Sequence, residues 1–340
     1  MNPELLAILA AQAEKADQST EWPALSLETV QTAGALHWSL PGPFGGCGQS
    51  ASELLAAHER IATACLTTAF ILSQREAAIR HLTKAPAHLQ QRFLPQLVAG
   101  GYASVGLSQL TTSRQHRGHA LRATATATGY RLDGEIPWVT GADQAVVIII
   151  GATLEDSSQI LVALPPDQAG LRIDPPMPLS ALAGSRTAMM KCNGVSVEHE
   201  LLLIQPKDRV LGPVGGGGLE TTNLALGLAV AALDLIQQEA TVRPDLAAVV
   251  DQLESATVDL RARVHALAVT PDSDAIHAAR VDGTRLALQA TQTALLAAKG
   301  AGFVHPHAAG RLARQALFFL VWSCPRPVVA GLLEDTTVRE

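Results

Sequence analysis

The sequence predicts an α+β protein with an N-terminal helical domain, a middle antiparallel β domain and a C-terminal four-helix bundle. Apolar residues recur at helical spacing in the first and last parts of the chain, whereas the middle part has short runs of alternating or continuous apolar character. Glycine and proline separate these runs, as expected between strands. We place the domains at residues 1–103, 104–206 and 207–340.

Composition limits the class of protein. The 340 residues are 48% hydrophobic and 16% charged, which suits a large buried core and argues against disorder. A formal net charge of −6 leaves no basic footprint for nucleic acid. The four cysteines are far apart and lack metal-ligand spacing, so we expect a reduced, cytoplasmic protein without a metal. The longest apolar runs, residues 145–152 and 316–322, are shorter than the roughly 20 residues that cross a bilayer, so we expect no membrane span.

The first part of the chain indicates helices. Leu5, Leu6, Ile8 and Leu9 have helical spacing, and residues 52–73 predict one long apolar helix. Residues 88–99 predict an amphipathic helix that the following two glycines end. Residues 40–50 are dense in glycine and proline and therefore predict a loop.

The middle part indicates strands. Residues 121–128 alternate apolar and polar residues, which is typical of a half-buried strand. The dipeptide Asp133-Gly134 favours a tight turn, so we expect a hairpin through it. Buried strands are expected at residues 145–150, 159–164 and 188–197.

The last part returns to helical spacing after the glycine run at residues 215–218. Four long patterns rich in alanine and leucine, at residues 221–240, 244–267, 274–299 and 307–333, predict a bundle. The glycine run lacks the lysine and hydroxyl residue of a phosphate-binding loop and is interpreted as a linker.

Five segments, in this order, carry a family resemblance. They are LPGPFGGCG at residues 40–48, AHLQQRFLPQLVAGG at 87–101, GYRLDGEIPWVTGADQAVVIIIGA at 129–152, LAGSRTAMMKCNGVSVEHELLL at 182–203 and KGAGFVHPHAAGRLARQALFF at 299–319. Together they resemble motifs of the acyl-CoA dehydrogenase family over nearly the whole chain. The resemblance implies that FAD binds between the sheet domain and the bundle, with an acyl-CoA as a small-molecule substrate. It also implies an oligomer, either a homodimer or homotetramer or an assembly with a homologue, because the family's bundles pack across subunits.

The resemblance assigns several cofactor residues. Trp138 and Thr140 match a tryptophan and a threonine that pack on the flavin and hydrogen-bond its reactive edge, roles that suit an aromatic face and a hydroxyl. Leu107 and Ser108 open a second flavin segment, in which Gln109 and Leu110 replace the family's glutamate and proline.

Two further cofactor residues depend on altered motifs. Thr112 or Ser113 could bind a pyrophosphate oxygen beside Arg114, or the segment is only a polar connection. Arg243 matches an arginine that reaches the pyrophosphate of a neighbouring subunit's FAD, although the family's following phenylalanine and glycine are missing.

The family's catalytic glutamate is missing from both of its usual positions, which fall on Ser323 and on Gly217. Glu220 lies about one helical turn after Gly217 and could face the same way, as the catalytic base. Alternatively, Glu220 is a solvated acid at a helix N-terminus. Cys324 is interpreted as inert packing.

Three functions therefore stay open. The first is an FAD-dependent oxidoreductase that dehydrogenates an acyl thioester with a displaced base. The second is a flavin-dependent monooxygenase of the same fold, which needs no such base. The third is an inactive scaffold or partner subunit, suggested by Lys299 where the family has glycine and by the altered flavin segment.

Overall fold

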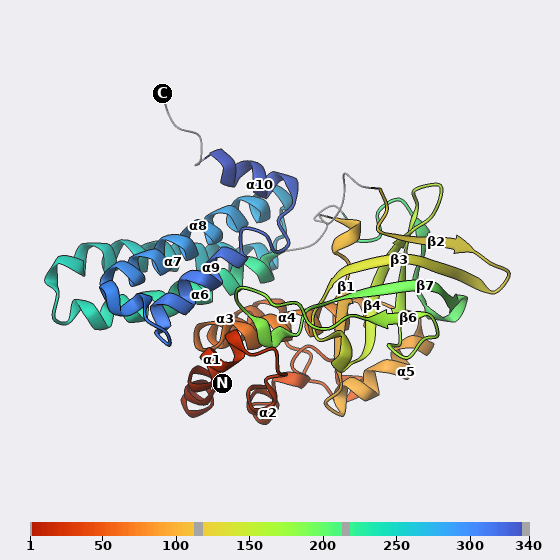
Figure 1. The fold of residues 1–340 in the computed structure, drawn as a ribbon, viewed down its shortest axis with the longest axis horizontal. Coiled ribbons are helices and arrows are strands. Elements are labelled where there is room, and N and C mark those ends of the chain that lie inside the picture. Colours follow the sequence, from red (N-terminus) through yellow and green to blue (C-terminus); the bar gives the residue numbers. More distant parts are fainter. Residues whose placement is uncertain (1, 112–117, 213–217, 335–340) are drawn as a thin grey trace.

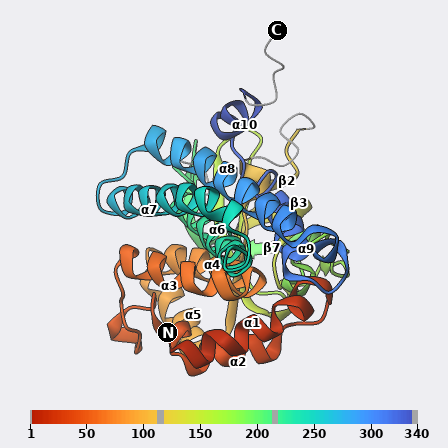
Figure 2. The same ribbon diagram turned by 90° about the vertical axis from the view of Figure 1, so that its left-hand side faces the viewer.

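The computed structural model describes residues 2–111, 118–212 and 218–334, and it confirms the predicted fold class. A helical N-terminal part and a C-terminal bundle lie side by side, and the sheet packs at one end of both (Figure 1). Figure 2, turned by 90°, shows α3 and α4 running next to α6. The predicted boundaries stay predictions; the first strand begins at Tyr102 and the last strand ends at Lys207.

Two of the N-terminal helices, α1 and α3, begin at side-chain caps. The Asn2 side chain accepts a hydrogen bond from the Glu4 backbone N–H, and Ser50 and Glu53 form a reciprocal capping box. Gly100, with φ of +96°, follows the fifth helix, as left-handed backbone after a helix favours glycine. These helices are α1 (Pro3–Gln18), α2 (Ala24–Thr32), α3 (Ala51–Ala64), α4 (Leu66–Leu82) and α5 (Ala87–Val98).

The single helix predicted over residues 52–73 is wrong. Cys65 has an extended backbone, with φ of −154° and ψ of 100°, and separates α3 from α4. The apolar pattern did not reveal this break because buried apolar residues, Ala62 before it and Leu66 after it, continue across it.

Over the residues that the structure describes, the sheet has eight strands: seven in the order β6-β7-β3-β2-β4-β5-β8, and β1, which pairs with β4. The expectation of a purely antiparallel sheet is wrong, because β1 and β2 each pair with β4 in parallel. The strands are β1 (Tyr102–Gly106), β2 (Leu121–Ala125), β3 (Gly129–Val139), β4 (Ala145–Thr153), β5 (Gln159–Leu164), β6 (Leu171–Ile173), β7 (Ala188–Glu198) and β8 (Leu202–Lys207).

The hairpin predicted at Asp133-Gly134 is also wrong, since β3 runs straight through this dipeptide. Gly134 has φ of +129°, and a Cβ built there would lie 2.2 Å from the Ala120 carbonyl oxygen. Asp133 and Gly134 lie where the register between β3 and β7 shifts. The glycine therefore serves a close strand approach at a bulge, and the β2–β3 turn comes before β3.

In the described part of the chain, the bundle consists of three long helices and two shorter ones. The continuous helix predicted over residues 307–333 is wrong, because a turn at residues 319–325 interrupts it. Ser323 in this turn has φ of +48°, and Pro325 caps the next helix. The helices are α6 (Leu219–Ala240), α7 (Ala247–Val269), α8 (Ser273–Ala298), α9 (Ala308–Phe318) and α10 (Arg326–Leu333).

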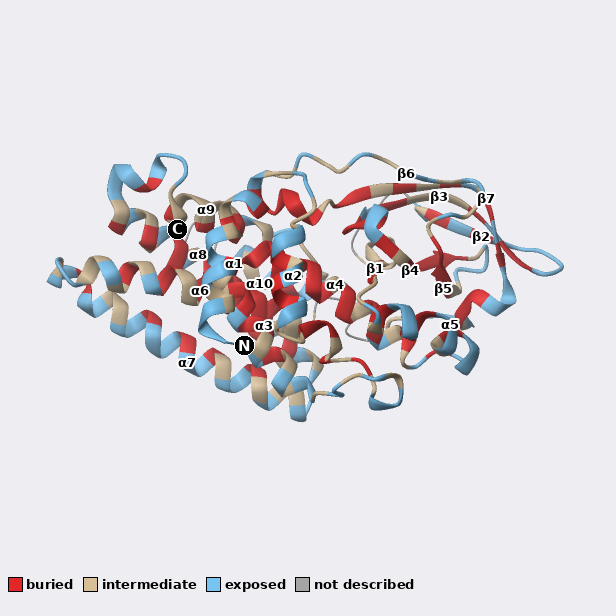
Figure 3. Cartoon of the chain, turned by 90° about the horizontal axis from the view of Figure 1, so that it is seen from below, coloured by how far each residue is buried: buried red, intermediate tan, exposed pale blue. Residues whose placement is uncertain are grey.

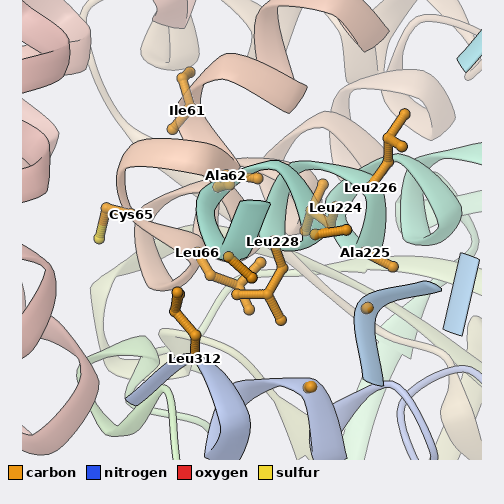
Figure 4. Packing of buried hydrophobic residues seen from close by; sticks show 14 of the residues in the cluster. Ile61, Ala62, Cys65, Leu66, Leu224, Ala225, Leu226, Leu228 and Leu312 are labelled. Atoms are coloured by element: carbon orange, nitrogen blue, oxygen red, sulfur yellow. The ribbon is translucent and has the colours of Figure 1, made fainter. Parts of the chain in front are cut away.

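Two large apolar clusters form the core (Figure 3). One surrounds α6, where Leu224 and Leu228 are fully buried beside Ala62 and Leu66 (Figure 4). The other lies between the sheet and α5. Helix α6 is long and apolar enough to span a membrane, with a mean hydropathy of 1.5, but 67% of that window is buried inside the protein. A core helix passes the same test, so this is weak support for a membrane segment.

Candidate functional site

A cavity of about 600 Å³ lies where α4, the sheet and the start of α6 meet the turn after α9. We call it the main cavity. It brings together five of the seven residues that the resemblance assigned to the site, although they come from distant parts of the sequence. These residues are Leu107, Ser108, Trp138, Thr140 and Glu220.

Strand β3 positions the two flavin-motif residues. Because side chains alternate along a strand, Val139 is fully buried on one face, whereas Trp138 is 47% exposed and lines the cavity. Thr140 follows the strand and is buried, with its hydroxyl 3.1 Å from that of Thr187. Ser104 fixes the Thr140 backbone by donating to its carbonyl oxygen at 2.6 Å.

The segment after β1 supplies an unused hydrogen-bonding group. The Ser108 hydroxyl is buried at the cavity wall and has no partner among the residues that the structure describes. Gln109, which replaces the family's glutamate, donates instead to the Gly106 and Gly151 carbonyl oxygens at 2.8 and 2.7 Å. Ser113, with Thr112 and Arg114, lies outside the described residues.

Helix α4 forms a wall that the sequence analysis missed. Six of its residues recur at helical spacing along the cavity, and none belongs to a recognised motif. Burial, and then the neighbouring charges of Arg80 and Lys84, lower the pKa of His81 to about 4, so its ring is neutral at neutral pH. The cavity-lining residues of α4 are Phe70, Ser73, Gln74, Ala77, Arg80 and His81.

Glu220 lies on the cavity wall near the start of α6 and pairs with Arg80. The two charged groups are 2.9 Å apart, and their side chains are 35% and 48% exposed. Among the described residues that line the main cavity, Glu220 is the one carboxylate. The pairing could not be found from the sequence, because no local pattern links α4 to α6.

The turn after α9 closes another side of the cavity. Trp322 stacks on Phe318 with ring centroids 5.1 Å apart, and Phe70 meets Trp322 edge-on at 4.8 Å. Ser323, at the position of the family's glutamate, lines the cavity next to them. Burial raises the pKa of the neighbouring Cys324 thiol, which fits a packing role.

Arg280 of α8 holds this turn in place. Its side chain is fully buried, and it donates to the Phe319 carbonyl oxygen at 2.7 Å and to that of Trp322 at 3.1 Å. It also donates to the Thr284 hydroxyl and lies over the Phe319 ring. Burial lowers the pKa of Arg280 to about 10. Arg280 therefore fixes the backbone that presents Trp322 and Ser323.

Arg243 is not part of the main cavity. It lies after α6, where it pairs with Asp245 at 2.9 Å and donates to the Ala297 carbonyl oxygen at 3.1 Å. Its contact with a neighbouring subunit's cofactor stays a prediction.

The cavity residues fit a flavin. The exposed Trp138 ring can cover a flat aromatic ring system, and the unpartnered Ser108 hydroxyl can bond a polar ring edge. Within the described part of the chain, no three histidine, cysteine or acidic side chains come together as a metal site.

Comparisons with known proteins agree with this geometry. The family profile described as acyl-CoA dehydrogenase, N-terminal domain, matches residues 6–101. The probable acyl-CoA dehydrogenase YngJ of Bacillus subtilis is 29% identical over 241 residues, which are 66% of this chain and 62% of that protein, less than two thirds of its length. Butyryl-CoA dehydrogenase from Megasphaera elsdenii superposes with a TM-score of 0.87 at 17% identity, over 99% of this chain and 97% of that one.

The N-terminal part of the chain therefore matches the acyl-CoA dehydrogenase N-terminal domain, and the whole chain has the fold of these enzymes.

An enzyme named for a different reaction, a monooxygenase, has the same fold. TdsC from Paenibacillus sp. A11-2, a dibenzothiophene monooxygenase solved with FMN bound, has a TM-score of 0.81 at 17% identity. That superposition covers 98% of this chain and 94% of TdsC. The fold is thus that of flavoproteins of more than one reaction type.

Proposed function

We propose that the chain is an FAD-dependent oxidoreductase that dehydrogenates an acyl thioester between its α and β carbons. The observation that carries the proposal is the main cavity itself. It combines Trp138, Thr140 and Ser108, which suit a flavin, with the carboxylate of Glu220.

In this proposal Trp138 covers the flavin ring, while Thr140 and Ser108 bond its polar edge. When bound, the flavin accepts the two electrons and the hydrogen that leave the β carbon. Glu220 removes the proton from the α carbon, as a carboxylate near a bound thioester can. Arg80, 2.9 Å from Glu220, orients this carboxylate. The aromatic cluster of Phe70, Phe318 and Trp322 excludes water from the acyl group.

A cytoplasmic location and an oligomeric assembly belong to the same proposal. All four cysteines are free thiols, which suits a reducing compartment. Phe303, Val304 and Leu296 are exposed near the end of α8, which suits a bundle that packs against another subunit.

The test begins with the absorption spectrum of the purified protein, followed by denaturation to identify any released flavin. With FAD bound, anaerobic addition of acyl-CoAs should bleach the flavin, and Glu220→Gln should slow the bleaching at least 100-fold. Glu200→Gln is the matched control, because Glu200 is a surface acid whose partner Arg92 lies 3.9 Å away. Equal rates for the two variants would refute Glu220 as the base.

A flavin-dependent monooxygenase is the second candidate. Ser323 at the cavity wall, where the family has its glutamate, favours it, and TdsC offers a structural precedent. Oxygen consumption that depends on reduced flavin, and that is insensitive to Glu220→Gln, would select this function. A protein that binds no flavin, even with excess FAD, would instead be a partner subunit.

A further inference from the structure

A second cavity of about 240 Å³, which we call the side chamber, adjoins the main cavity. It lies between α3, α4, the first turn of α6, the end of α7 and the start of α8. Most of its wall is apolar, so it suits a hydrocarbon chain. The apolar wall residues are Ala51, Leu54, Leu55, Leu219, Leu267, Ala268, Pro271 and Ile276.

Arg80 and Glu220 are the two residues that line both cavities. Their ion pair therefore forms the partition between the main cavity and the side chamber. Both side chains are a third to a half exposed, so neither is held by dense packing. Ion pairs with this much exposure contribute little to stability, so the two side chains can shift together, still paired, when a ligand enters.

Glu76 supplies an unused acceptor at the wall of the side chamber. Glu76 is only 3% exposed, and its Oε2 atom has no hydrogen-bond partner among the described residues. A buried acceptor of this kind is satisfied by water or by a ligand that donates a hydrogen bond. The side chamber thus combines an apolar wall with one site for a donor.

One of the two acids at the chamber wall is already paired before any ligand enters. Glu220 pairs with Arg80, and the charge of buried Arg75 acts on Glu76. Burial lowers the pKa of His58, the remaining titratable wall residue, against the opposing effect of Glu76 and Glu220, so this ring is neutral. A carboxylate on the ligand would face Glu76 while Arg80 is already paired with Glu220, whereas a hydroxyl can donate to Glu76.

We infer that the side chamber binds the distal end of the acyl group, and that the preferred acyl chain ends in a hydroxyl that donates to Glu76. This inference rests on the proposed function, because it requires an acyl thioester in the main cavity. It adds the substrate class, a hydroxyacyl thioester, to that function.

Titration calorimetry of the full-length, FAD-loaded protein tests the inference without requiring turnover. The probes are acyl-CoAs of 6, 8, 10 and 12 carbons, each with a terminal methyl, hydroxyl or carboxylate. At the length that reaches Glu76, the hydroxyl form should bind about tenfold more tightly than the methyl form, which corresponds to one well-made hydrogen bond. The carboxylate form should bind more weakly than the methyl form.

Glu76→Met should abolish the hydroxyl preference and leave methyl-ended chains bound at least as well as before. Glu76→Gln, which keeps a carbonyl acceptor and the side-chain shape, should retain part of the preference and serves if the methionine variant does not fold. The surface variant Glu200→Gln should keep the full preference.

The outcomes separate the two proposals. If every acyl-CoA binds but methyl and hydroxyl ends are equal at all lengths, Glu76 is hydrated and this inference alone is overturned. Tightest binding of the carboxylate form also overturns the inference, because the end of the chain would then pair with Arg80 instead of donating to Glu76. If no acyl-CoA binds, the proposed function fails and the inference fails with it.

Discussion

Replacing Arg280 by leucine tests whether one buried guanidinium holds the cavity turn. The substitution removes the bonds to the carbonyl oxygens of Phe319, at 2.7 Å, and of Trp322, at 3.1 Å. The first oxygen is buried and the second is partly so. An acceptor left unpaired in the interior costs about 1–3 kcal/mol, while leucine avoids the desolvation of the guanidinium. We therefore expect Arg280→Leu to lower the free energy of unfolding by about 2–4 kcal/mol.

Urea unfolding followed by tryptophan fluorescence measures this effect, since Trp322 lies in the affected turn. Arg280→Lys keeps the charge and three donors but not the planar fork, so it should lose less than half as much. The control is Arg285→Leu on the same helix. This side chain is 39% exposed and donates to one part-buried carbonyl oxygen, that of Gly331 at 2.8 Å, so its loss should change stability by less than about 1 kcal/mol. If Arg280→Leu unfolds at the wild-type urea concentration, the turn does not depend on these bonds and our account of it is refuted.

Three further predictions concern other parts of the chain. Gly227→Ala should destabilise the protein by about 1–3 kcal/mol, because the added carbon would lie 2.6 Å from the Ala62 Cβ atom; urea unfolding measures this. His81 has a pKa of about 4 when folded, against 6.5 in the unfolded chain, so the unfolded state alone binds a proton between these values. Stability should therefore fall by up to about 1.4 kcal/mol per unit as the pH drops from 6.5 to 4, and His81→Gln should flatten the slope. Trp138→Ala should weaken flavin binding about three- to tenfold, measured by fluorescence titration.

A specific result would contradict each of these three predictions. Gly300→Ala, where an added carbon meets nothing within 4 Å, should be nearly neutral, and equal losses for the two glycine variants would contradict the packing argument. An unchanged pH slope in His81→Gln would assign the acid sensitivity to other groups. Unchanged flavin affinity in Trp138→Ala would place the cofactor elsewhere.

The fold was predictable because its periodicities are local. Strand β5 spans the residues that the apolar run indicated, Gln159–Leu164. Where two local backbone conformations favour the same residue type, the sequence did not distinguish them. A glycine with positive φ serves a hairpin turn and a bulge equally well, so Asp133-Gly134 favoured the wrong one. The interruption at Cys65 was hidden because buried apolar residues, Ala62 before it and Leu66 after it, continue across it.

Some residues of the site could likewise be predicted from the sequence, and others could not. The motif residues Trp138 and Thr140 were assigned from the sequence, and the structure places both at one cavity. Arg80 and Glu76 escaped notice, because their importance depends on contacts with the cavities and with Glu220, which the fold creates. The local sequence around a charged residue on a long helix does not show whether that residue lines a cavity or faces solvent.

Helix α4 takes part in both large apolar clusters. Leu66, Ala69 and Leu72 belong to the cluster around α6, and Ile71 and Ile79 belong to the cluster under the sheet. The same helix lines the main cavity along its length. Helix α4 therefore connects the bundle and the sheet rigidly. A hinge motion between the bundle and the sheet would have to break the packing of α4 in one of the two clusters. Access to the cavity must come from small local shifts at its rim, such as those of exposed side chains. A bound ligand that braces α4 should then raise the melting temperature of the sheet and of the bundle together.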